Sequence, residues 1–227
     1  MQKLLSLSPD RVALYGYAHV PWMAKRQQMI PSEALPTPQE RLALFKTARR
    51  LFLWDGYDEI GIDHFATPDD GLSVARRAGR LRRNFQGYTD DTSEVLIGLG
   101  ASSISRFPQG YAQNAPATGA YTAAIREGRF ATARGHRISD EDRMRGRMIE
   151  MLMCAFRIDI AALTTEFAID TARMQNMLAE AAAAFEGHLH LDAGGLFIPP
   201  AARPLTRMVA RRLDAYEMDA AGHSSAI

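Results

Sequence analysis

Apolar runs separated by one long amphipathic segment dominate the N-terminal part of the chain. Residues Arg11–Val20, RVALYGYAHV, are almost continuously apolar and rich in β-forming residues, which is typical of a buried parallel strand. Thr37, Pro38 and Glu40 have the spacing of a capping box with proline in the first turn, so a helix of about 17 residues is predicted to begin there. Residues 57–63, YDEIGID, predict the next strand. Strand, helix and strand in this order predict a right-handed parallel βαβ unit.

Mainly helices are predicted after this unit. A short helix is expected at residues 70–78 and a third strand at Val95–Ile104. Further predicted elements are helices at 118–127, after the cap residue Ser139, at 161–167, at 171–185 and from Pro204 onward, with a short hairpin at 188–198. The polar segment RGHRISDED marks a predicted domain boundary. We expect one domain at residues 1–130 and a mainly helical, winged-helix-like domain at residues 131–227. The tail AAGHSSAI is predicted to be disordered.

The composition is that of a globular protein without a strong charge bias. The chain has 227 residues, of which 47% are hydrophobic and 23% charged, and its net charge is +1 at pH 7. This charge gives no argument for a nucleic-acid partner. No apolar run reaches the roughly 18 to 20 residues that a membrane helix needs, and the start MQKLLSLSPD lacks the features of a signal peptide. We therefore expect a cytoplasmic protein without a membrane partner.

The sequence has one cysteine, Cys154. A single cysteine excludes an intrachain disulfide and any metal site that this chain alone would build from several thiolates. Cys154 lies in a methionine-rich predicted helix, where a buried and inert thiol is expected.

Two histidines follow the predicted parallel strands. His19 lies near the end of the first strand, and Asp63 and His64 end the second. Ligands of parallel sheets bind at the carboxyl ends of strands, so both segments are expected on one rim. Each histidine is either a hydrogen-bonded structural group or a proton-transfer group. Asp63 either orients His64 or a ribose hydroxyl, or caps the next turn.

Arginines cluster before the segment NFQGYT. Arg82 and Arg83 immediately precede it, and their guanidinium groups suit carboxylate ligands, with each charge-assisted bond contributing roughly 1.5 to 3 kcal/mol. The alternative for these arginines is an ordinary solvated surface.

Several segments together carry a resemblance to a known family. They are YGYAHVPWMAKRQ, GYDEIGIDHFATPDDGLSVA, RRNFQGYTD, LIGLGASSIS, YAQN and CAFRIDI, in this order. The sequence from about Arg11 to Asp159 resembles the oxygen-independent coproporphyrinogen III oxidases, which are radical S-adenosylmethionine enzymes. The resemblance implies an α/β fold, namely the C-terminal part of a radical S-adenosylmethionine (β/α) barrel followed by the winged-helix-like domain.

The resemblance also implies an activity and its site. Enzymes of this family convert two propionates of coproporphyrinogen III to vinyl groups with loss of carbon dioxide, through a 5′-deoxyadenosyl radical. Ala18 matches a position that contacts the adenine of S-adenosylmethionine. Phe85, Gln86 and Ile104 match positions around a second S-adenosylmethionine. Arg83 and Arg82 are the expected anchors for substrate carboxylates.

The family's cluster motif has no counterpart in this chain. These enzymes hold a 4Fe–4S cluster with Cys-x3-Cys-x2-Cys, whereas Cys154 is alone here. The chain is therefore expected to be the C-terminal half of such a protein, inactive by itself. A half-barrel leaves strand edges unpaired, so the chain is expected to aggregate, to dimerise or to need its N-terminal half as a partner.

Two other functions are also compatible with the sequence. One is a tetrapyrrole-binding protein without radical chemistry. The other is a nucleic-acid-binding winged helix that uses Arg207, Arg211 and Arg212 of the final predicted helix. Acidic residues such as Asp214 and Glu217 follow closely, so nucleic acid is not the expected partner.

Overall fold

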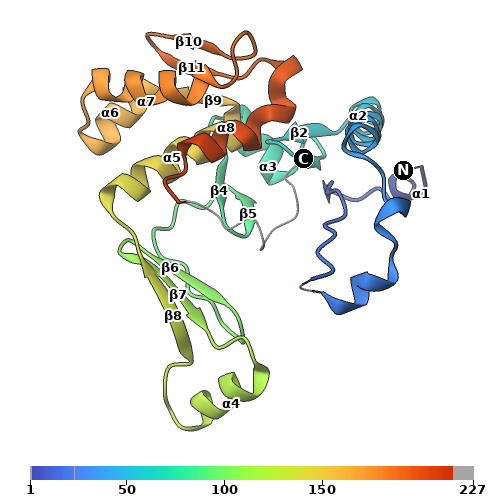
Figure 1. Cartoon of the computed structure of the whole chain (residues 1–227), viewed down its shortest axis with the longest axis vertical. Coiled ribbons are helices and arrows are strands. Elements are labelled where there is room, and N and C mark those ends of the chain that lie inside the picture. Colours follow the sequence, from blue (N-terminus) through green and yellow to red (C-terminus); the bar gives the residue numbers. More distant parts are fainter. Residues whose placement is uncertain (1, 23, 217–227) are drawn as a thin grey trace. The chain divides into compact units, whose positions relative to one another are not determined.

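The computed structural model describes residues 2–22 and 24–216, and these belong to two compact units (Figure 1). The first unit joins the residues up to 90 with those from 147 onward, and the second unit holds residues 91–146. The expected domain boundary between residues 130 and 131 falls inside this second unit. The tail AAGHSSAI, which was predicted to be disordered, lies outside the described residues.

Short strands and helices make up the N-terminal part of the first unit. In chain order they are α1 (Gln2–Leu5), β1 (Arg11–Ala13), the 3-10 helices η1 (Lys25–Met29) and η2 (Ser32–Ala34), α2 (Pro38–Trp54), β2 (Asp58–Ile60), β3 (His64–Ala66), α3 (Gly71–Arg77), β4 (Arg82–Asn84) and β5 (Gly87–Thr89). The capping box predicted for α2 is confirmed: the Thr37 side chain accepts a hydrogen bond from the Glu40 backbone N–H, and the Glu40 carboxylate accepts one from the Thr37 N–H.

The first sheet corrects the predicted parallel βαβ unit. Its strand order is β1-β3-β2, and β3 pairs antiparallel with both neighbours. Strands β1 and β2 therefore run in the same direction, but β3 lies between them. The turn after β2, with Gly61 at φ +56°, reverses the chain and makes this insertion possible. Asp63 consequently lies in a turn between strands, and residues 14–20 continue from β1 without regular structure.

Two apolar clusters hold this sheet to its neighbours. In one, Phe52 of α2 stacks on Phe65 of β3 with ring centroids 4.5 Å apart, and Tyr57 meets Phe52 edge-on. The other cluster joins the sheet, α3 and the β4–β5 hairpin to the end of α5, and its buried members are Ile60, Ala66, Leu72, Leu81 and Cys154. Tyr88 of β5 packs against this second cluster.

The C-terminal part of the first unit is mainly helical. Helix α5 (Asp140–Ala155) begins in the second unit and ends in the first. It is followed by β9 (Arg157–Asp159), α6 (Ile160–Phe167), α7 (Thr171–Ala183), β10 (His190–Asp192), β11 (Gly195–Phe197), the 3-10 helix η3 (Pro200–Leu205) and α8 (Thr206–Leu213). The predicted hairpin is confirmed as β10–β11, and it forms an antiparallel sheet with β9 in the order β10-β11-β9. Leu163 of α6, Met174 of α7 and Leu196 of β11 are fully buried in this part of the chain.

The second unit is a small antiparallel sheet with one helix. Its elements are β6 (Ile104–Phe107), β7 (Gly110–Asn114), α4 (Thr118–Arg126) and β8 (Thr132–Arg137), with strand order β6-β7-β8. The strand predicted at Val95–Ile104 is wrong in its position, because β6 begins only at Ile104. Residues before it make a single bridge, Leu96 to Arg106. Gly98 passes so close to the Ile104 backbone that a side chain there would overlap it.

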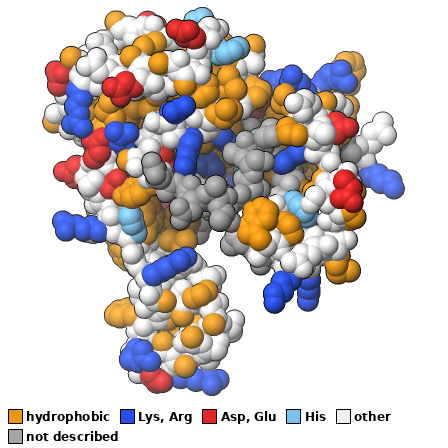
Figure 2. All heavy atoms as spheres, in the orientation of Figure 1, with side chains coloured by type: hydrophobic (Ala, Val, Ile, Leu, Met, Phe, Trp, Pro, Cys, Tyr) orange, Lys and Arg blue, Asp and Glu red, His pale blue; other side chains and the backbone are white. Residues whose placement is uncertain are grey.

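Hydrophobic side chains also lie on the surface of both units (Figure 2). Trp54 of the first unit and Phe130 of the second are the most exposed large ones, at 90% and 94%. Within the described part of the chain, none of the helices has both the length and the apolar character that crossing a membrane requires.

Candidate functional site

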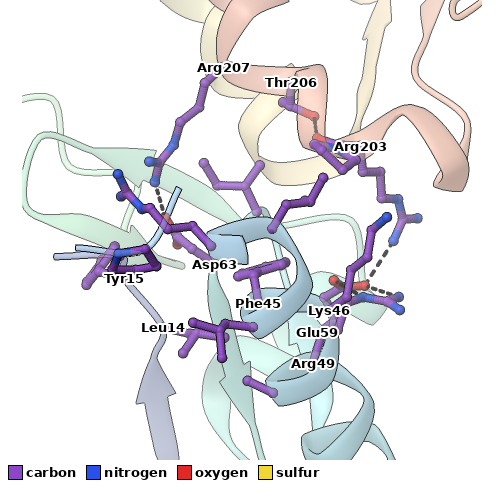
Figure 3. Close-up of a pocket in the computed structure, with 18 of the residues that line it drawn as sticks. Leu14, Tyr15, Phe45, Lys46, Arg49, Glu59, Asp63, Arg203, Thr206 and Arg207 are labelled. Atoms are coloured by element: carbon purple, nitrogen blue, oxygen red, sulfur yellow. Dashed lines mark hydrogen bonds and ion pairs between the residues drawn. The ribbon is translucent and has the colours of Figure 1, made fainter. Parts of the chain in front are cut away.

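A cavity of about 790 Å³ lies in the first unit, bounded by residues 14–19, helix α2, η3 and α8 (Figure 3). Its volume falls in the range of roughly 300 to 1,000 Å³ that is usual for small-molecule sites. Apolar walls come from residues that include Leu14, Leu42, Phe45, Ile62 and Phe156. Five cationic side chains and two carboxylates share the lining, namely Arg41, Lys46, Arg49, Arg203 and Arg207 with Glu59 and Asp63. The cavity therefore combines apolar walls with a positive charge excess.

Asp63 connects the sheet to helix α8 on one side of this cavity. It is buried, with 4% of its surface exposed, and its Oδ2 accepts a hydrogen bond of 2.6 Å from Arg207 (Figure 3). Its Oδ1 lies 2.6 Å from His64 Nδ1. Because a carboxylate accepts hydrogen bonds, Nδ1 of His64 carries the proton of this contact. Of the two roles left open for Asp63, the structure supports the orientation of His64, and it adds an ion pair that sequence analysis missed.

Two tyrosine rings contact the ring of His64. The ring of His64 meets Tyr15 edge-on at 5.8 Å and Tyr88 edge-on at 5.0 Å between centroids. The Tyr88 hydroxyl accepts a hydrogen bond from the Ile62 N–H and donates one to the Met153 carbonyl, and burial raises the pKa of Tyr88 well above its ordinary value. This tyrosine therefore remains neutral and serves as a fixed structural bridge.

Arg83 lies on the same face of the hairpin as Tyr88. The two residues are opposite one another in the β4–β5 pair, and the guanidinium carbon of Arg83 lies 5.6 Å from the centre of the Tyr88 ring. The Nε atom of Arg83 is buried and has no hydrogen-bond partner among the described residues. A buried donor without a partner is uncommon, and the Nε atom of Arg203 is in the same state.

Arg82 is bound within the protein. Its Nε donates to Glu150 of α5 at 2.8 Å, and Arg147 donates to the other oxygen of the same carboxylate at 2.8 Å. The backbone N–H of Arg83 adds a third hydrogen bond to Glu150. Of the two arginines expected to anchor substrate, the structure thus leaves Arg83 with an unused donor and engages Arg82.

Glu59 forms a second ionic group on the opposite side of the cavity (Figure 3). It accepts two hydrogen bonds from Arg49 of α2, at 2.6 and 2.8 Å, and one from Arg203 of η3 at 3.0 Å. The hydrogen bonds to Glu59 raise the pKa of Arg49. Arg203 also lies over the ring of Phe156, 4.1 Å from its centre. These contacts join α2, β2 and η3, and sequence analysis did not predict them.

His19 and Arg41 occupy another part of the lining. The Nε2 atom of His19 contacts the Ser32 hydroxyl at 3.1 Å, while its buried Nδ1 has no partner among the described residues. Arg41 lies against Gly16, where a side chain on the glycine would overlap the guanidinium group. The two predicted histidine segments do meet at this cavity, since both His19 and Asp63 line it.

The predicted S-adenosylmethionine positions lie in both units. Ala18 is in the irregular segment after β1, and its carbonyl accepts a hydrogen bond from the Gln27 side chain at 3.0 Å. Phe85 and Gln86 form the tip of the β4–β5 hairpin, where Phe85 is 44% exposed. Ile104 begins β6 in the second unit and is half-buried. The exposed ring of Phe85 and the exposed amide of Gln86 have the chemistry to stack on and hydrogen-bond to a nucleobase.

The described residues do not fit an iron–sulfur cluster. No group of three or more His, Cys, Asp or Glu side chains able to hold a metal occurs in residues 2–22 and 24–216. Burial raises the pKa of Cys154 to about 12, so its thiol stays protonated and is a poor ligand, in agreement with the predicted inert thiol.

Comparisons with known proteins give a consistent result, although no family model matches the chain. It is 67% identical to the oxygen-independent coproporphyrinogen III oxidase of Paracoccus denitrificans over 227 residues, which are 100% of this chain and 50% of that protein. It is 34% identical to the corresponding protein of Escherichia coli, covering 95% of this chain and 48% of the relative. The solved structure of coproporphyrinogen III oxidase from Escherichia coli, a radical SAM enzyme, matches with a TM-score of 0.88 and 33% identity over 95% of this chain and 50% of that one. The chain spans about half the length of the relatives it matches.

Proposed function

Because the chain is homologous over its whole length to one half of the oxygen-independent coproporphyrinogen III oxidases, we propose that it is the C-terminal half of such an oxidase. The observation that carries this proposal is the 67% identity to the Paracoccus denitrificans protein across all 227 residues. In finer detail, we propose that the first sheet belongs to the C-terminal part of a radical S-adenosylmethionine barrel. The hairpin β10–β11, followed by α8, supports a winged-helix-like module.

In this proposal Arg83 binds a propionate carboxylate of coproporphyrinogen III. Three observations support this role: its half-buried position, its buried Nε without a partner, and its fixed placement over the Tyr88 ring. Arg82 contributes indirectly, because its ion pair with Glu150 holds β4 to α5. A carboxylate held by Arg83 exchanges its hydration shell for a directional charge-assisted hydrogen bond, which orients the propionate side chain.

S-adenosylmethionine is the proposed cofactor. By resemblance to the family, Ala18 is a proposed contact for the adenine of one S-adenosylmethionine. Phe85, as a stacking surface, and Gln86, as an amide for hydrogen bonding, are proposed positions around a second one, as is Ile104. Bound S-adenosylmethionine supplies the radical chemistry of this family. This chain cannot hold the cluster that the chemistry requires, so the other half of the oxidase is the proposed partner.

Arg207 argues against the nucleic-acid alternative. That function requires Arg207 on an open surface beside Arg211 and Arg212, whereas Arg207 donates to the buried Asp63. Because this arginine already donates to Asp63, it has fewer N–H groups left to bind a phosphate than an exposed arginine has.

Reassembly of the enzyme tests the proposed function. The chain is mixed with the half of the Paracoccus denitrificans relative that it does not cover, the cluster is reconstituted, and conversion of coproporphyrinogen III to the divinyl product is followed by chromatography of the oxidised porphyrins. We expect conversion by the mixture and none by either half. Production of 5′-deoxyadenosine by this chain alone, or a reconstituted mixture without conversion, would contradict the proposal.

A further inference from the structure

We propose that Arg41 of helix α2, supported by Lys46, anchors carboxylate groups of a tetrapyrrole inside the cavity of the first unit. The class of ligand rests on the proposed function, whereas the site rests on the structure alone. Arg41 is half-buried and lines the cavity, and no described residue accepts a hydrogen bond from its guanidinium group. Lys46 lines the same cavity from the same helix and likewise has no carboxylate partner among the described residues.

The charges of the cavity leave these two cations available. Both carboxylates in the lining are already engaged: Asp63 by Arg207 and His64, and Glu59 by Arg49 and Arg203. Arg41 and Lys46 are therefore cations without a carboxylate partner in the lining; Arg41 is half-buried, whereas Lys46 is exposed to solvent at the same cavity. Attraction between opposite charges is stronger in such a partly dehydrated space than in bulk water, which favours an anionic ligand.

The Arg41 guanidinium group reaches the segment that follows β1. It lies directly against Gly16, where a side chain on the glycine would overlap it. The same segment carries His19, whose buried Nδ1 also lacks a partner and provides a further polar contact at the cavity wall.

The other walls fit the body of such a ligand. Leu14, Phe45, Ile62 and Phe156 present apolar surface in a space of about 790 Å³. A tetrapyrrole with several propionates has the matching character, because its ring system is apolar and its charges lie at the periphery. Simple phosphates or small dicarboxylates would leave these apolar walls unfilled. The combination of surplus cations and apolar walls therefore favours a large carboxylated ring over a small anion.

Fluorescence titration with coproporphyrin III, a stable oxidised probe with four carboxylates, tests this site on the whole chain. We expect Arg41→Gln to weaken binding about tenfold or more, as expected for loss of a charge-assisted contact, and Lys46→Gln to weaken it less. Arg50→Gln is the matched control, because Arg50 is exposed on the same helix and does not line the cavity. It should bind like the unsubstituted chain. The tetramethyl ester of the same porphyrin, which lacks the carboxylates, should bind weakly and equally to all four proteins.

Three outcomes would overturn the inference. The first is no saturable binding of coproporphyrin III by the unsubstituted chain. The second is equal binding by the Arg41→Gln and Arg50→Gln variants. The third is normal probe binding by Arg41→Gln together with weakened association with the other half of the oxidase, which would make the cavity a docking site for protein. None of these outcomes decides the reassembly assay, which tests the proposed function separately. If the reassembly assay fails, the porphyrin titration can still be interpreted.

Discussion

The two faces of strand β4 use neighbouring arginines in opposite ways. On one face, Arg82 donates to Glu150, which also binds Arg147 and the backbone of residue 83. On the other face, Arg83 lies over Tyr88 with a buried Nε that has no partner among the described residues. Alternate residues of a strand point to opposite faces, so adjacent arginines meet different surroundings.

The difference lies in the carboxylates and not in the arginines. Glu150 is largely buried and accepts three hydrogen bonds, so on this face the hairpin is linked to α5 by contacts within the protein. No carboxylate faces Arg83 within hydrogen-bond distance in the described part of the chain. The comparison shows that the surroundings of an arginine, and not its residue type, decide whether the protein itself engages its guanidinium group.

Substitution of Gly61 should lower the stability of the chain most, because it displaces Tyr88 from the face of the hairpin that also carries Arg83. A methyl group at this position would overlap the Tyr88 hydroxyl, and φ of +56° is unfavourable for alanine. We expect Gly61→Ala to lower the free energy of unfolding by roughly 3 to 5 kcal/mol, combining backbone strain with the loss of two hydrogen bonds. Urea denaturation measures this value.

Gly56→Ala is the matched control for that substitution. Gly56 also has a positive φ, +87°, but no atom lies within 4 Å of the added methyl group. It should cost only about 1 kcal/mol. If both variants lose the same free energy of unfolding, the position of Tyr88 does not require a glycine at residue 61.

Substitution of Glu150 should remove the ion pairs on the Arg82 side of the strand and lower the stability by a smaller amount. Glu150→Gln removes the charge that binds Arg82 and Arg147, and we expect a loss of roughly 2 to 3 kcal/mol in the free energy of unfolding. Arg83→Gln removes a cation without an acceptor, so the same measurement should change by less than about 0.5 kcal/mol. Comparable losses in the two variants would contradict the distinction between the faces.

Cys154 should produce no effect at neutral pH and a loss of about 1.5 kcal/mol at pH 10.5, which is smaller than the loss expected for Glu150→Gln. Burial, reinforced by Glu150, raises its pKa from 9.0 to about 12 in the folded chain. The folded protein therefore retains the thiol proton where the unfolded chain releases it, and its contribution is full below pH 9 and lost between pH 9 and about 12. We expect about 1 kcal/mol of loss per pH unit in that range. Cys154→Ala should lack this component when thermal unfolding is compared at pH 8 and at about pH 10.5; parallel curves would refute it.

Local sequence signals predicted the helices well. The capping box of Thr37 and Glu40 specifies the start of α2 through contacts between residues three apart. The cap residue Ser139 and the hairpin around Gly194 and Gly195 are equally local, and the structure confirms both. Such features depend on neighbours along the chain, so the sequence contains all that is needed to recognise them.

Contacts between distant residues explain what the sequence did not predict. β3 enters between β1 and β2, although the apolar pattern of residues 57–66 does not distinguish one strand from two separated by a tight turn. The ion pairs of Glu59 with Arg203 and of Asp63 with Arg207 each join residues 144 positions apart. Nothing in the sequence distinguishes Arg41, because its lack of an acceptor is a property of the folded surroundings.

The strand order β1-β3-β2 also determines the order in which the sheet can form. The ends of β2 and β3 are separated only by the turn around Gly61, so their pairing closes a very short loop and requires little loss of chain entropy. Pairing of β1 with β3 must close the long loop that contains α2. Loop entropy therefore favours assembly of the β2–β3 hairpin first, and we expect β1, with the cavity-lining segment that follows it, to join this sheet later.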